Sequence, residues 1–219
     1  MSNLLTSSTR ALNPIERVSE VFFGLIMVLT FTGSLSVAEA GRDDVRAMLI
    51  GALGCNLAWG IIDAVLYLMG RLAEKGRNIA ALRAVREAAD PSVGRRVVAE
   101  GLPPLIAGVL QPAQLDAVRL QLIALPEPAA RPKLDRNDWL GATGSFLLVF
   151  LSTFPVAIPF MIVRSAGPAM RISNLIAIVL LFLTGYAFGK ISGYGPIRVG
   201  FAMVVIGMVL VGLTIALGG

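Results

Sequence analysis

Residue types that metal centres and disulfides require are scarce or missing from this sequence. The 219 residues include no histidine and one cysteine, Cys55. A single cysteine cannot form a disulfide within the chain, and zinc sites built from CxxC pairs or histidines are excluded. The sequence also shows no Ser/Lys or Asp/Asp catalytic pattern and no cofactor motif. We therefore expect a protein that is not an enzyme and holds no permanent cofactor.

Charged residues are scarce as well. They make up 15% of the chain, whereas hydrophobic residues make up 56%. This balance excludes an ordinary soluble domain and favours a protein with several membrane spans. The first ten residues, MSNLLTSSTR, lack the apolar core of a secretory signal peptide. We expect an integral protein of the lipid bilayer, in a bacterial inner (plasma) membrane.

Long apolar runs are the most abundant feature of the chain. Each of five runs can cross a hydrocarbon core about 30 Å thick as a helix. The segment Asn13-Pro14-Ile15-Glu16 predicts the start of the first helix, with Asn13 as N-cap and Pro14 at the first helical position. The predicted spans cover residues 18–38, 48–69, 140–163, 172–189 and 197–217.

The polar interval between the second and third spans has helical periodicity. Asp90-Pro91 restarts a helix within it, and residues 113–125 are amphipathic. The sequence thus predicts an all-α membrane protein with three segments. Residues 1–70 hold the first two spans, residues 71–137 form a helical cytoplasmic insertion of three or four short helices, and residues 138–219 hold the last three spans.

The basic residues predict the orientation of the chain. With five spans, 15 of the 19 Lys and Arg residues lie on the side of the N-terminus and the insertion, and 4 lie on the other side. Because cytoplasmic loops carry the basic excess, the N-terminus is expected in the cytoplasm and the C-terminus outside. The net charge of +5 is then a topology signal, and we expect no nucleic-acid partner.

The second span carries three polar residues along one helical face. Asn56, Asp63 and Tyr67 are seven and four residues apart, so they point in similar directions at about 100° per residue. A carboxylate inside a span is costly and usually faces protein or a water-filled cavity. One interpretation is that Asp63 handles ions or protons on a transport path with Asn56 and Tyr67. The other is a buried anchor that is protonated or hydrogen-bonded to its neighbours.

The first span offers a second candidate group. Glu20 and Met27 lie roughly along one face, and oxygen ligands suit Mn²⁺ and Fe²⁺. We predict that Glu20 and Asp63 bind the transported metal and that Met27 lines its path. The alternative is that Glu20 lies near the membrane interface and pairs with Arg17 or Lys190, while Met27 only packs.

The third span contains two prolines, Pro155 and Pro159, in the segment FPVAIPF. Two prolines four residues apart remove two backbone donors, so the helix must kink or break where protein or water can satisfy the freed carbonyls. Such a break is predicted to border a pathway, although many breaks are only packing kinks.

Three segments between Gly141 and Gly219 read FLSTFPVAIPF, LLFLTGYAFGKISG and IRVGFAMVVIGMVLVGLTIALGG. In these segments the chain resembles the vacuolar iron transporter (VIT) family most in local sequence, and in layout it resembles the family over nearly its whole length. The resemblance implies a homodimer whose first spans line a metal path at the interface. We accordingly expect cysteines placed at Gly24, Met27 or Phe31 to crosslink two copies.

The resemblance also implies a function, namely transport of Fe²⁺, Mn²⁺ or related divalent ions out of the cytoplasm in exchange for protons. The family's first span carries an Asp-Gly pair followed by proline, and its second a Gly-Glu-Tyr-like segment. Here the corresponding stretches read SEVFFGLIMVLTFTG and GIIDAVLY, and the insertion lacks the family's cluster of glutamates and methionines. Asp63 is the candidate replacement in the second span. A VIT-like scaffold or interaction protein without transport is the alternative.

Overall fold

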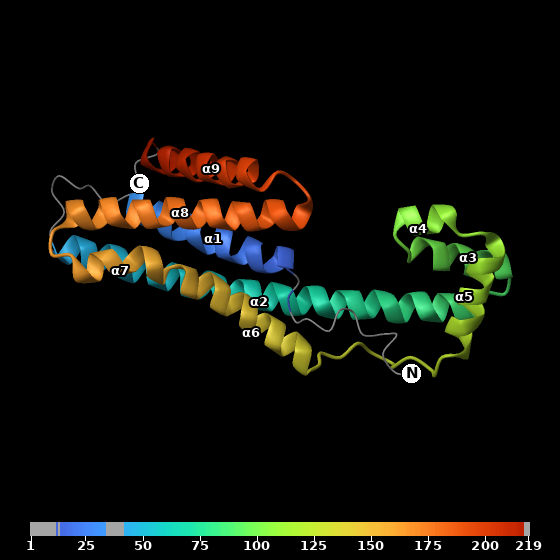
Figure 1. The fold of residues 1–219 in the computed structure, drawn as a ribbon. Coiled ribbons are helices and arrows are strands. Elements are labelled where there is room, and N and C mark those ends of the chain that lie inside the picture. The colour runs from blue at the N-terminus through green and yellow to red at the C-terminus, as the bar shows by residue number, and fades with distance from the viewer. Residues whose placement is uncertain (1–11, 13, 34–41, 217–219) are drawn as a thin grey trace. The chain divides into compact units, whose positions relative to one another are not determined.

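The computed structural model describes residues 12, 14–33 and 42–216, which contain helices and turns and no strand (Figure 1). The all-α prediction is confirmed, and the first helix begins at Pro14, while its predicted N-cap, Asn13, lies outside the described residues. The helices in chain order are α1 (Pro14–Gly33), α2 (Arg42–Glu87), α3 (Pro91–Glu100), α4 (Pro104–Val109), α5 (Pro112–Ala124), α6 (Arg136–Ser152), α7 (Phe154–Ile162), α8 (Ala166–Ser192) and α9 (Pro196–Ala216).

Three stretches in the described residues are long and apolar enough to cross a membrane. They are Asp43–Glu87 in α2, Arg136–Ile162 in α6 and α7, and Ala166–Ser192 in α8. In α9 the stretch Pro196–Leu210 is apolar but shorter. In α1 the first turns carry Glu16, Arg17 and Glu20, which lowers the hydropathy of a helix that is only 20 residues long. The chain is an integral membrane protein, and the count of five spans stays a prediction.

The chain divides into two compact units. Unit 1 comprises residues 1–67 and 136–219, and unit 2 comprises residues 68–135. Helix α2 contributes its first part to unit 1 and its last part to unit 2. In unit 1, α8 packs along α9 and α7, and α1 packs against α6, α8 and α9 (Figure 1). In unit 2, α3 packs against α4 and α5.

Helix α2 is longer than the sequence predicted. The prediction ended the second span near residue 70 and began the helical insertion at residue 71, whereas one helix, α2, continues without a break for 46 residues to Glu87. Good helix formers follow Gly70, and Arg71 pairs with Glu74 one turn later, so nothing in the local sequence terminates the helix there. The restart at Asp90-Pro91 is confirmed, with Asp90 as the N-cap of α3.

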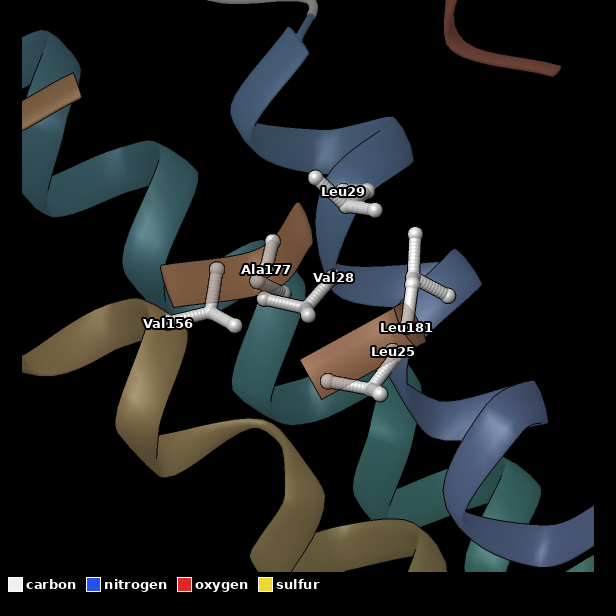
Figure 2. Packing of buried hydrophobic residues seen from close by; sticks show 7 residues of the cluster. Leu25, Val28, Leu29, Val156, Ala177 and Leu181 are labelled. Atoms are coloured by element: carbon white, nitrogen blue, oxygen red, sulfur yellow. The ribbon is translucent and has the colours of Figure 1, made fainter. Parts of the chain in front are cut away.

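The core of unit 1 is an apolar cluster where α1 meets α7 and α8. Figure 2 shows Leu25, Val28 and Leu29 of α1 directed toward side chains of the other two helices. Leu25 and Val28 are completely buried. Glu20 and Gly24, on another side of α1, contact α6. The remaining members of the cluster are Ala52, Val156, Ala177 and Leu181.

Gly24 brings α1 and α6 into close contact. A Cβ atom at this position would overlap the Ser152 hydroxyl and lie 2.6 Å from the carbonyl oxygen of Val149. Only glycine lets the two backbones approach so closely. A cysteine at Gly24 is therefore a poor probe for crosslinking two copies, because this position is buried within one chain. Met27 is half-buried, and the side chain of Phe31 lies outside the described part.

Candidate cation site between α1, α2 and α6

Glu20 lies two turns into α1, on the side that faces α6. Its Oε1 accepts a hydrogen bond from the hydroxyl of Ser145, at 2.7 Å. Ser145 is completely buried and Glu20 is half-buried. The hydroxyl orients the carboxyl group without neutralising it, since a serine carries no charge. The interpretation in which Arg17 or Lys190 neutralises Glu20 finds no support in the interactions found for this group.

Asp63 approaches Glu20 from α2. The two carboxyl groups lie within hydrogen-bonding reach of each other. Among the described residues, Oδ2 of Asp63 is buried and has no hydrogen-bond partner. Ionised carboxylates only accept hydrogen bonds, so two of them at this separation need a proton or a cation between them. The pair can therefore hold either one, in a half-buried position between α1 and α2.

Tyr67 lies one turn beyond Asp63 on α2. Its ring rests against Gly141 of α6, where any Cβ atom would overlap the phenol. A second close contact occurs at Gly60, where a Cβ atom would lie 2.9 Å from the ring of Phe146. These small residues hold α2 against α6 on either side of Asp63. The carboxyl pair is thus fixed in a packed helix interface.

Asn56 forms a second polar contact two turns from Asp63. It is completely buried, and its Nδ2 donates to Oγ1 of Thr153 at 2.6 Å and to the carbonyl oxygen of Gly24 at 3.5 Å. Thr153 is the residue between the end of α6 and the start of α7. Pro155 lies in the first turn of α7, and Pro159 lies inside it. The interruption of the third predicted span therefore lies at a contact with α2.

The contacts establish the directions of the three helices. Passing from Glu20 to Gly24 along α1 corresponds to passing from Ser145 to Ser152 along α6. Over the same distance the contacting residues on α2 run backwards along the chain, from Asp63 to Asn56. Helices α1 and α6 are therefore parallel, and α2 is antiparallel to both. The polar contacts form successive layers along one three-helix interface.

The structure brings together most of the predicted path residues. Glu20 meets Asp63, while Asn56 and Tyr67 lie on the same α2 face against α6. Met27 is half-buried on α1, seven residues beyond Glu20, and its role in a path stays a prediction. Within the described residues there is no group of three or more His, Cys, Asp or Glu side chains that could hold a metal ion.

Sequence reasoning missed the contribution of α6. Gly141, Ser145, Val149 and Thr153 are all buried and follow each other at intervals of four residues. Small and hydroxyl residues at this spacing in an apolar helix form a face for close helix contact. That pattern in GATGSFLLVFLST was the signal from which the contact face of α6 could have been predicted. It predicts a contact face, although it does not say that Glu20 is the partner of Ser145.

Comparison with known proteins assigns the later part of the chain to a protein family. A model of the VIT family matches residues 87–219, more than half of the sequence. The match covers α3 to α9 and includes Ser145, Thr153 and both prolines of α7. Glu20, Asn56, Asp63 and Tyr67 precede it. A search of curated proteins finds no match.

Proposed function

Since the chain belongs to the VIT family, a family of membrane transporters of metal ions, we propose that it carries divalent ions of the Fe²⁺ and Mn²⁺ class out of the cytoplasm in exchange for protons. The observation that carries this proposal is the Glu20–Asp63 pair, held between α1 and α2 and oriented by Ser145. The metal is the substrate, and the protein needs no resident cofactor. Carboxylate oxygens are ligands that both ions accept.

The pair links metal binding to proton release through charge. Without a metal ion, one proton lies between the two carboxyl groups and relieves their repulsion. A divalent ion that enters between them replaces this proton, which leaves the site. Oδ2 of Asp63, which has no hydrogen-bond partner among the described residues, gives the ion a ligand. When the ion leaves, a proton from the other side of the membrane can return to the pair.

The proposal includes the five-span topology, with the N-terminus in the cytoplasm and the C-terminus outside. Its support is the direction of the helices in unit 1. The first and third spans of a chain that crosses five times must be parallel and the second antiparallel, as α1, α6 and α2 are. A reporter fused after Gly219 is expected outside, and one inserted near Pro128 in the cytoplasm. Both reporters on the same side would rule out the proposed topology.

We also propose the homodimer that the resemblance implies. Only 17% of the apolar window of α2 is buried within one chain, so its outer side is available to lipid or a second copy. A cysteine at Met27 remains a suitable crosslinking probe, and Gly24 does not. The measurement is crosslinking in bilayers together with the mass of the protein in mild detergent. A monomer in both settings would remove the dimer from the proposal.

The test of function is metal flux into liposomes with and without a pH gradient. Asp63→Asn and Glu20→Gln keep the shape of each side chain and remove its titratable charge. Each is expected to reduce Fe²⁺ and Mn²⁺ flux at least about tenfold, equivalent to roughly 1.4 kcal/mol on the limiting barrier. The matched control is Asp116→Asn in unit 2, which removes an acid that is paired with arginines.

The same measurement decides between transport and the scaffold alternative. The absence of a three-ligand group in the described residues is the observation that favours a scaffold. A scaffold would insert normally and show no flux of any divalent ion. Robust wild-type flux that neither substitution changes would mean that other residues bind the metal.

A further inference from the structure

Asn56 is an unusual residue to bury inside an apolar helix interface. It is completely buried, and only its Nδ2 has partners, on Thr153 and Gly24. Its Oδ1 is buried without a hydrogen-bond partner among the described residues. Gly24 supplies a carbonyl, which can only accept, so the amide nitrogen must face it and the orphaned atom is the oxygen. A buried oxygen without a donor destabilises the protein unless it has another use.

The backbone on either side of Thr153, the partner of Asn56, has oxygens whose usual helical donors are missing. Because residues 155 and 159 are prolines, the carbonyls of Leu151 and Pro155 lose the N–H donors that a helix would supply four residues later. Inside a membrane, such carbonyls are tolerated where they line protein or a water-filled cavity. Interrupted helices in transporters use freed carbonyls of this kind to coordinate cations.

The Asn56 layer lies next to the carboxyl pair on the same three helices. Asn56 is seven residues from Asp63 on α2, which is about 10 Å along the axis at 1.5 Å per residue. Gly24 is one turn from Glu20 on α1, and Thr153 is eight residues from Ser145 on α6. An ion that leaves the carboxyl pair along this interface therefore meets Asn56 next.

We propose that Asn56 Oδ1, the Thr153 hydroxyl and the carbonyls freed by Pro155 and Pro159 form a second, uncharged subsite for a partly dehydrated divalent cation. This inference rests on the proposed transport function and adds a subsite to the path. Its ligands are all neutral oxygens, which suit Mn²⁺ and similar hard cations. A neutral site holds the ion less tightly than two carboxylates, and weak binding at a second site favours release rather than retention.

A binding experiment can detect this subsite without transport. Trp59 lies one turn from Asn56, with its ring 5.4 Å from that of Phe23. The chain has two tryptophans, so a Trp139→Phe background leaves Trp59 as the only one, and Mn²⁺ can be titrated against its fluorescence in the full-length protein. Adding Glu20→Gln and Asp63→Asn is expected to weaken quenching at least about tenfold. The remaining quenching should disappear with Asn56→Leu.

A flux experiment separates the two subsites by their kinetic parameters. Asn56→Leu and Thr153→Val are expected to lower the maximal Mn²⁺ flux about tenfold with KM within about twofold, because the carboxyl pair still captures the ion. Asp63→Asn should raise KM as well. Thr153→Ser keeps the hydroxyl and should restore the rate. Thr153→Val keeps the side-chain volume and tests the proposal if Asn56→Leu does not fold.

Ser173→Ala is the matched control for a purely structural role. Ser173 is completely buried on α8, and its hydroxyl donates to the carbonyl oxygen of Val156 on α7 at 2.7 Å. If Thr153 only supports α7, Thr153→Val and Ser173→Ala will lower flux equally, and the subsite is overturned while transport stands. If the wild type carries no divalent ion, the transport function fails, and the titration decides about the subsite. If Asn56→Leu leaves unchanged the quenching that remains in the Glu20→Gln and Asp63→Asn background, the proposed subsite is overturned.

Discussion

Acidic side chains occur in both units, but their partners differ. In unit 2, the two oxygens of Asp116 accept from Arg119 Nε at 2.7 Å and from Arg95 Nη1 at 3.1 Å. Asp135 pairs with Lys75 at 2.8 Å. In unit 1, the partners of Glu20 are a serine hydroxyl and a second carboxyl group. Several acids of unit 2 thus have fixed cations as partners, whereas among the described residues no cation pairs with the carboxyl pair of unit 1.

This difference indicates where a mobile cation can bind. An acid that is paired with arginine gains little from a metal ion, because the metal must first displace the guanidinium. A carboxyl pair without a fixed cation has to take a proton or a metal ion from solution. Paired acids of unit 2 such as Asp116 and Asp135 therefore serve structure, and those of the α1–α2 interface can serve transport.

The largest effect is expected from supplying unit 1 with a fixed cation. Asp63→Lys places an ammonium group beside Glu20 and turns the pair into the type of contact found in unit 2. Metal flux should fall at least about a hundredfold, or roughly 2.7 kcal/mol, because the lysine occupies the position of the ion. The charges of Lys and Glu20 balance, so insertion should survive. Liposome flux at matched incorporation is the measurement, and retained flux would show that metal does not pass between these residues.

The second prediction concerns metal binding by the whole chain. With Glu20→Gln, Asp63→Asn and Asn56→Leu all in place, calorimetry is expected to show Fe²⁺, Mn²⁺ and Zn²⁺ bound no better than by a generic acidic surface. The reason is that residues 71–137 lack the glutamate and methionine cluster and have arginines beside their acids. The wild type is the control. Micromolar, stoichiometric binding by the triple variant would instead identify Glu87, Asp90 and Glu100 as ligands.

The carboxyl pair illustrates how far the sequence could predict the site. The seven- and four-residue spacing of Asn56, Asp63 and Tyr67 predicted their common face, because helical periodicity is a local property of the chain. The pairing of Asp63 with Glu20 depends on the register between two helices, which no local pattern specifies. Ser145 was missed for the same reason. Its importance comes from the helix opposite, although its spacing from Gly141 and Thr153 marks a contact face.

In the fold, too, local features were predictable from the sequence and contacts between helices were not. The apolar runs and the Asp90-Pro91 restart predicted helices correctly, because capping and burial act within a few residues. The helix does not end near residue 70, where the second predicted span ends, since a change from apolar to charged side chains does not by itself end a helix that good helix formers continue. The burial of Gly24 against Ser152 could not be predicted either, because a glycine in a span fits a dimer axis as well as an internal contact.

A smaller effect is expected from removing the hydroxyl that orients Glu20. Ser145→Ala deletes the donor to Oε1 but leaves both carboxyl groups in place. Flux should fall only about fivefold, roughly 1 kcal/mol, in the range of a single hydrogen bond. Ser152→Ala on the same helix is the control, because its hydroxyl donates to the carbonyl of Val149 and not to an acid. Equal losses from both variants would mean that Ser145 contributes only to packing.

The smallest expected effect is a change in the stability of unit 2 with pH, which arises from its paired acids. The hydrogen bond from Arg119, followed by the charges of Arg119 and Arg95, holds the pKa of Asp116 below its ordinary value. Because the folded-state pKa is lower than that of the unfolded chain, the stabilisation is present at neutral pH and is lost as the pH falls through the folded-state pKa, below about pH 4.

Hydrogen exchange of α3 and α5 in the full-length protein, corrected for the intrinsic rate at each pH, is the measurement for this effect. Wild-type protection should fall as the pH is lowered below about pH 4, and Asp116→Asn should show lower protection at neutral pH with less further loss in acid. Glu100→Gln, which removes another acid of unit 2, should follow the wild type. A variant at Asp116 that loses protection as steeply as the wild type would show that the arginine pairs do not stabilise unit 2. The contrast between its acids and the carboxyl pair would then rest on unit 1 alone.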